Sequence, residues 1–170
     1  MRNCNSLTVL LLLLLAFTSS VLAQTSKKYQ SRTLAQVVEL NRTSTDKIFG
    51  KTKLEERSQF IGIDPMFTKA HVQFLGDRRQ ITEGHRVLID WWRKLQKIDG
   101  KFIQLYQEEF LFKEGSEEYW IPCQTQTAEL IAKNFKNGDK ITLLVAYIGA
   151  HKEKNEKDYS SLFLSTGFEP

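Results

Sequence analysis

The alternation of apolar and polar residues predicts one amphipathic helix in the middle of the chain. Apolar residues recur at helical spacing between Thr82 and Lys97, and Thr82 with Glu83 after it is a good helix start. The apolar positions that gather within about 140° of a helical wheel are Val87, Leu88, Trp91, Trp92 and Leu95. We expect this stripe, with both tryptophans, to pack on the same domain. The alternative is that such a basic helix lies on a membrane.

Residues 101 to 168 carry the patterns of strands and of one short helix. In chain order they predict a long bent strand over 101–112, a turn at 113–118, a returning strand over 119–123, a short helix over 127–135, a central strand over 140–149 and a last strand over 159–169. The run 140–149 is apolar on both faces, which is typical of a strand covered on both sides. The apolar parity of the first strand shifts around Glu108 and Glu109, which indicates a bulge.

The region before the tryptophan helix is more polar. Residues 31–40 predict a short helix with Leu34, Val37 and Val38 near one face, and 41–53 read as a polar loop. Two short strands are expected over 58–64 and 70–76, separated by Pro65. Asn41 begins an Asn-x-Thr glycosylation acceptor pattern, which matters only in a eukaryotic host.

The order strand, strand, helix, strand, strand in residues 101 to 168 resembles part of an OB-fold-like small barrel. A strand near 59–75 would complete the barrel, with the tryptophan helix as an insertion. The fold class expected is therefore α+β, either an antiparallel sheet or an OB-like, partly open barrel, with an amphipathic helix packed on it. Both alternatives fit the pattern.

The first residues predict export. Arg2 precedes an apolar run from Val9 to Phe17, and small residues follow, as in a secretory signal peptide cleaved after Ala23. The run is too short to span a bilayer, and no later stretch predicts a transmembrane segment. We expect residues 1–23 to be a signal peptide, 24–57 a basic segment that is partly helical or flexible, and 58–170 a single α+β domain. The mature protein would be secreted or periplasmic.

Positive charge is concentrated in the basic segment. Residues 24–57 hold eight basic and four acidic side chains, whereas the whole chain holds 24 and 20. Such a segment could make a peripheral contact with an anionic envelope surface, although a solvated arm is the simpler interpretation.

The residues that could support catalysis show no convincing arrangement. Removal of the signal peptide would leave Cys123 as the one cysteine, which favours a small buried side chain over a reactive thiol or an intermolecular disulfide. Glu108 and Glu109 are adjacent and would point to opposite faces of a regular strand. Three histidines, His71, His85 and His151, lack metal-ligand spacing, so we predict no metal and no cofactor.

A non-catalytic binding or interaction module is therefore the preferred function, with an unknown protein or small molecule as partner. Exposed aromatic residues of the hairpin and loops such as 151–158 are the expected contacts. The candidate binding residues are Phe102, Tyr106, Phe110, Tyr119 and Trp120, with Phe112 in the same stretch. Five acids against two lysines in 101–122 argue against nucleic acid as the partner. The alternative is a small hydrolase or thiol-dependent enzyme that uses Cys123 or Glu108/Glu109.

Overall fold

The computed structural model describes residues 28–49, 59–151 and 160–169. Contacts within the chain define one compact unit over Ser31–Pro170 and a separate leading unit over Met1–Gln30. The expected signal peptide with its cleavage after Ala23, residues 24–27 and 50–57 of the basic segment and the loop that follows His151 lie outside the described residues. In the part of the chain that is described, no helix has the length and apolar character needed to cross a membrane.

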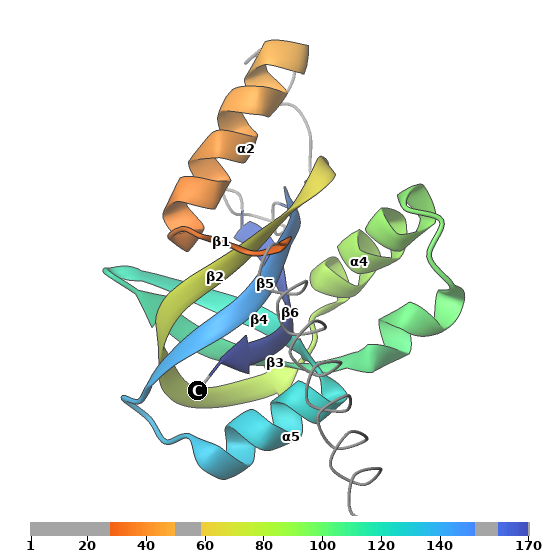
Figure 1. Cartoon of the computed structure of the whole chain (residues 1–170). Helices are drawn as coiled ribbons and strands as arrows, with labels where there is room; N and C mark the ends of the chain where they lie inside the picture. The colour runs from red at the N-terminus through yellow and green to blue at the C-terminus, as the bar shows by residue number, and fades with distance from the viewer. Residues whose placement is uncertain (1–27, 50–58, 152–159, 170) are drawn as a thin grey trace, which may run out of the picture. The chain divides into compact units, whose positions relative to one another are not determined.

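In the described ranges the chain forms six strands and four helical segments, whose arrangement Figure 1 shows. The strands are β1 (Gln30–Ser31), β2 (Gln59–Gln80), β3 (Tyr106–Glu114), β4 (Glu117–Gln124), β5 (Lys140–His151) and β6 (Ser160–Glu169). The helices are α2 (Leu34–Phe49), α4 (Glu83–Leu95), the 3-10 helix η1 (Gly100–Leu105) and α5 (Thr125–Asn134).

The sheet closes on itself. Its strand order is β1-β2-β3-β4-β6-β5, and β2 also pairs with β5, so that β2 to β6 form a ring. β4 and β6 run parallel where Cys123 lies opposite Ser165, and the remaining pairs of the ring are antiparallel. The α+β class and the OB-like, partly open barrel are thereby confirmed. The sheet is mixed, because the parallel pair closes it.

β2 is the strand that makes closure possible. It pairs with β5 from Gln59 to Gln73 and with β3 from Gln73 to Gln80, so it changes neighbour at Gln73. The prediction of two separate short strands was wrong. Pro65 only interrupts the ladder between Ile61 and Met66, since a proline lacks the N–H that a ladder needs.

Two hydrophobic cores lie on the two faces of the sheet. The core inside the ring holds Tyr147, Phe163, Phe110 and Phe112 and is covered by residues of α2 and α5. The second core lies between the outer face of the sheet and α4, where Ile148, Leu162 and Leu164 meet Leu88 and Trp92. Because both faces of β5 are covered, the continuous apolar run of this strand is explained and its central position is confirmed.

The tryptophan helix forms as expected but is rotated about its axis. Thr82 caps α4 by accepting a hydrogen bond from the His85 amide at 3.3 Å. Trp92 is buried, whereas Trp91 and Leu95 are 51% and 58% exposed, so the expected burial of both indoles was wrong. The buried face, which also includes Ile89, is turned by about 80° from the predicted stripe. The polar contact of His85 described below explains this rotation.

Three further predictions need correction. The first residues of the expected strand 101–112 form η1, and the strand begins only at Tyr106. The bulge is present, but its extra residue is Gln107, one position before Glu108. The expected polar loop after residue 40 is a helix as far as Phe49.

Hydroxyl groups allow α2 to continue through its polar residues. Ser44 and Thr45 donate hydrogen bonds to the carbonyls one turn earlier, at 2.9 and 2.8 Å, and so remain compatible with a helix. Asn41 is only 6% exposed within this helix, which makes it a poor glycosylation acceptor. Leu34 and Val37 are fully buried, so residues 31–49 of the basic segment belong to the same compact unit as the barrel.

Candidate functional site

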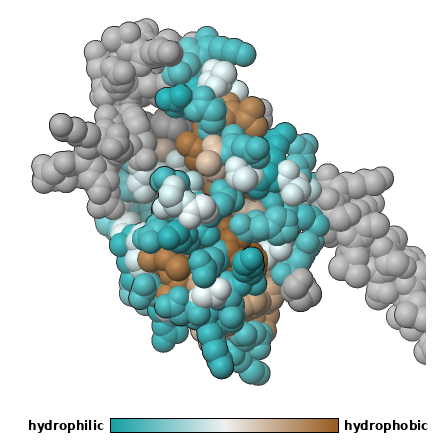
Figure 2. Space-filling view, turned by 90° about the vertical axis from the view of Figure 1, so that its left-hand side faces the viewer, coloured by the Kyte–Doolittle hydropathy of each residue, from teal (hydrophilic) through white to brown (hydrophobic). Residues whose placement is uncertain are grey.

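The aromatic residues of the hairpin do not form one exposed surface. Tyr106, Phe110 and Phe112 have at most 1% of their surface exposed and belong to the two cores, so they cannot contact a ligand. Phe102 is partly buried and packs 5.7 Å from the Trp92 ring. Figure 2, which views the side toward which the β3–β4 hairpin projects, shows mostly hydrophilic side chains, with hydrophobic ones in small separate areas.

Tyr119 and Trp120 are partly buried, and each is held by one partner. The ring of Tyr119 meets Phe163 edge-on at 5.9 Å. The guanidinium of Arg79 lies 4.0 Å over the Trp120 ring, a cation–π contact that already occupies one face of the indole. Among the five predicted binding residues, these two and Phe102 keep some contact surface for a partner.

Cys123 is buried in the core inside the ring, as the preferred interpretation expects. Its exposed fraction is 0%, and its thiol donates to the carbonyl of Ile121 at 3.4 Å. Burial raises the pKa of this thiol to about 12, so it is protonated at neutral pH. A protonated thiol without solvent access is a poor nucleophile, which argues against the thiol-dependent enzyme.

Glu108 and Glu109 are not brought together by the bulge. Glu108 lines a shallow hollow of about 230 Å³ beside α5. Glu109 is fully buried, and its two carboxylate oxygens accept from Arg79 Nε and from His85 Nδ1, each at 2.5 Å. The two carboxylates therefore have separate environments, and an acid–base pair that shares one substrate does not form.

Glu109 and His85 form a buried polar pair between the sheet and α4, and the partly exposed side chain of Arg79 completes the cluster. The ring of His151 meets that of His85 edge-on, with centroids 5.0 Å apart. His85 is 2% exposed and His151 5%, so no substrate reaches these rings as they stand. The cluster fixes α4 to β2 and β3 and has the geometry of a positioning network. Nothing in the spacing of these residues along the chain reveals it, because it depends on the register that places Arg79 opposite Glu109.

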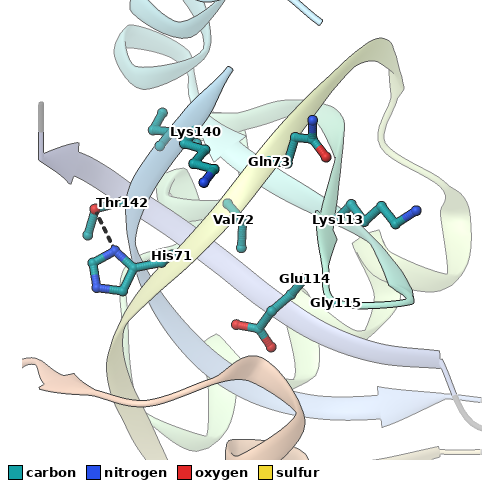
Figure 3. A pocket seen from close by; sticks show the side chains of 9 residues that line it. His71, Val72, Gln73, Lys113, Glu114, Gly115, Lys140 and Thr142 are labelled. Carbon is teal, nitrogen blue, oxygen red and sulfur yellow. Dashed lines mark hydrogen bonds between the residues drawn. The ribbon is translucent and has the colours of Figure 1, made fainter. Parts of the chain in front are cut away.

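A larger hollow opens where β2 changes neighbour (Figure 3). Its volume is about 600 Å³, which is within the range of small-molecule sites. The side chains around it come from β2, from the end of β3 and from the beginning of β5. They are His71, Val72, Gln73, Lys113, Glu114, Lys140, Ile141 and Thr142, with Gly115 at the hairpin turn.

Strand register places two lysines around one glutamine. Gln73 lies opposite Lys113 on one side and opposite Lys140 on the other. Adjacent strands lie about 4.8 Å apart, so the backbones of the two lysines are roughly 10 Å from each other. Figure 3 shows the Lys140 ammonium turned toward the middle of the hollow, whereas the Lys113 side chain starts at the rim and points away from the other lining residues. The Gln73 amide is held by the hydrogen bond that its Nε2 donates to the Gly138 carbonyl, at 3.1 Å.

Glu114, the one carboxylate among the lining residues, is engaged by helix α2. One of its oxygens accepts hydrogen bonds from the amides of Leu34 and Ala35, at 2.7 and 3.4 Å. The positive end of the helix thus offsets its charge. Partial burial raises the pKa of Glu114, and the two amide hydrogen bonds act in the opposite direction. The charge left to act on a ligand is that of the lysines.

His71 and Thr142 face each other across two strands. They are in register, and His71 Nδ1 lies 2.9 Å from the Thr142 hydroxyl (Figure 3). A catalytic pair, with the Thr142 hydroxyl as nucleophile and His71 as base, would have the same distance. His71 is exposed, however, and the one hydrogen bond described for its ring is the bond to Thr142. A base in such a pair is normally oriented by a third group. The pair is better explained as a cross-strand contact that presents the remaining imidazole nitrogen to a ligand.

Comparison with models of protein families, with curated proteins and with solved structures finds no match to this chain. The argument for function therefore depends on the described residues themselves. The sequence singled out only His71 among those that line the larger hollow. The two lysines and Gln73 lie far apart in the chain, and only the pairing of β2 with both neighbours brings them together.

Proposed function

We propose that the protein is an exported, non-catalytic binding module that takes a small anionic group in the hollow between β2, β3 and β5. The observation that carries this proposal is the pair of lysines around Gln73, beside a carboxylate whose charge is already offset by α2. Export rests on the signal-peptide pattern of the first 23 residues.

The hollow favours a small ligand or the end of a chain. Two ammonium groups are donors that suit carboxylate or phosphate oxygens, and the hydrogen-bonded His71–Thr142 pair adds one more donor, either the imidazole Nε2–H or the hydroxyl, according to the tautomer. Val72 and Ile141 contribute apolar surface. A long nucleic acid would also meet the acidic β3–β4 hairpin. Glu114, Glu117 and Glu118 lie at its tip, so we propose no nucleic acid as partner.

NMR titration with named anions tests this function. Inorganic phosphate and citrate are added separately to the isotopically labelled protein, and the amide shifts of Gly115 and Thr142 are followed. We expect saturable shifts at these amides, and at least about tenfold weaker binding after Lys113→Gln together with Lys140→Gln, because each cation contacts the anion directly.

The matched control is Lys133→Gln with Lys136→Gln, which removes the same charge from α5 and the residues after it. This control should bind as the unchanged protein does. Equal weakening in both double variants would show that only net charge matters, and the hollow would then not be the site. Shifts confined to other parts of the barrel would equally contradict the proposal.

A further inference from the structure

α4 has more apolar surface than the barrel covers. Its apolar positions extend over about 200° of the helical wheel, from Val87 through Trp91, Leu95 and Leu88 to Ile89. The contact with the sheet uses only the part around Leu88, Ile89 and Trp92, which is buried. The remaining stripe, Val87, Trp91 and Leu95, recurs every four residues and therefore follows one line along the helix.

This stripe is exposed in the described structure. Trp91 and Leu95 show about half of their surface or more, and Val87 is partly exposed. Since Trp92 accounts for the packing of the helix, packing does not require Trp91.

The charges beside the stripe are mainly positive. Lys94 and Lys97 are exposed, and Arg86 lies one turn before Asp90. Asp90 is already paired with both Arg93 and Lys94, at 2.6 Å, and these cations hold its pKa below the usual range. Glu83 is the exposed acid of the first turn, and Arg86 lies 4.0 Å from it. The local balance is therefore positive along a line of apolar side chains.

We propose that the outer face of α4 docks on the surface of a membrane that contains anionic lipids. Tryptophan and leucine enter the boundary between headgroups and acyl chains, while the stems of lysines beside them follow the apolar surface and place their ammonium groups among lipid phosphates. The contact is peripheral and reversible, since only one stripe of a 13-residue helix takes part. It does not depend on the anion-binding hollow, whose residues come from other elements.

Flotation with lipid vesicles tests this docking. Residues 24–170 are mixed with vesicles of one of two compositions. One is pure phosphatidylcholine, and in the other one lipid in four is phosphatidylglycerol. We expect binding to the anionic vesicles and much weaker binding to the neutral ones. Trp91→Ala with Leu95→Ala should weaken binding at least about tenfold, and Lys94→Gln with Lys97→Gln about fivefold for each lysine.

Matched controls separate this face from the rest of the chain. Leu130→Ala removes a leucine of α5 that is 48% exposed, and it should leave vesicle binding unchanged. The basic segment 24–57 is intact in every variant. If the Trp91/Leu95 variant floats as well as the unchanged protein, that segment or another surface binds the membrane and the proposal is wrong. Absence of flotation with the unchanged protein, or a dimer that Trp91→Ala dissociates without lipid, would overturn it as well.

Discussion

Glu109→Gln is the substitution that tests the buried cluster most directly. The glutamine amide has the shape of the carboxylate but carries no charge. It has a single oxygen that can accept a hydrogen bond, whereas both oxygens of Glu109 now accept one. One donor, on Arg79 or on His85, then faces the amide NH₂. Because His85 is 2% exposed, it has no access to water that would replace the lost partner.

The cost follows from the two hydrogen bonds. A hydrogen bond to a charged group contributes about 1.5–3 kcal/mol, and a buried donor left without an acceptor costs about 1–3 kcal/mol. The side chain of Arg79 is 41% exposed and can turn to solvent, so its share of the loss is smaller. We therefore expect Glu109→Gln to lower the free energy of unfolding by about 3–5 kcal/mol, as is typical when one partner of a buried ion pair is removed.

Urea unfolding, followed by circular dichroism and tryptophan fluorescence, measures this loss. Glu108→Gln is the matched control, since it removes a neighbouring carboxylate that lies outside the cluster, and it should change the free energy by less than about 0.5 kcal/mol. Glu109→Leu combined with His85→Leu should recover most of the loss, because an apolar replacement leaves no buried charge. A loss below about 1 kcal/mol for Glu109→Gln, or an equal loss for Glu108→Gln, would refute the reasoning.

Three further predictions concern other buried groups and their neighbours. Trp92→Ala should cost about 3–5 kcal/mol in urea unfolding, whereas Trp91→Ala, whose ring is half-exposed, should cost less than about 0.5 kcal/mol. Gly84→Ala should destabilise by about 1–3 kcal/mol, measured by thermal unfolding, since the added Cβ would lie 2.8 Å from Nε2 of the buried His151 ring. The Cys123 thiol should react with iodoacetamide only as fast as the protein unfolds. Because its folded pKa is raised from 9.0 to about 12, stability should also fall as pH rises through that range, by up to about 4 kcal/mol, and Cys123→Ala should remove this part of the loss.

Local pattern was sufficient for the elements whose surroundings are simple. The run 140–149 predicted a strand covered on both faces, and β5 lies between β2 and β6 with a core on either side. The cap at Thr82 and the short helix before Asn137 were predicted from the residues that begin and end them. The element order in 101–168 was sufficient to suggest the barrel, which β2 completes by pairing with both β3 and β5.

The errors arose where contacts distant in sequence override local preference. Serine and threonine at 44 and 45 usually indicate a loop, yet they bond back to their own helix and α2 continues. The rotation of α4 is set by His85, which reaches a carboxylate on β3. A helical wheel treats His85 as polar and therefore exposed, so the wheel alone points the wrong face of α4 toward the sheet. Tyr106 and Phe110 were expected at the surface because aromatic residues in a hairpin do not reveal which face is covered.

The position of the candidate site follows from the closure of the barrel. A strand that pairs with one neighbour before a given residue and with another after it must leave those neighbours apart where it changes over. At Gln73 this separation creates the hollow, and the same register sets one lysine on each side of it. Covering the outer face of the sheet requires only part of the apolar arc of α4, which leaves the Trp91 stripe free. The hollow and the Trp91 stripe both follow from this topology, and neither is needed to hold the barrel together. Substitutions in either surface should therefore leave the barrel folded, so that anion binding and membrane docking can be tested independently.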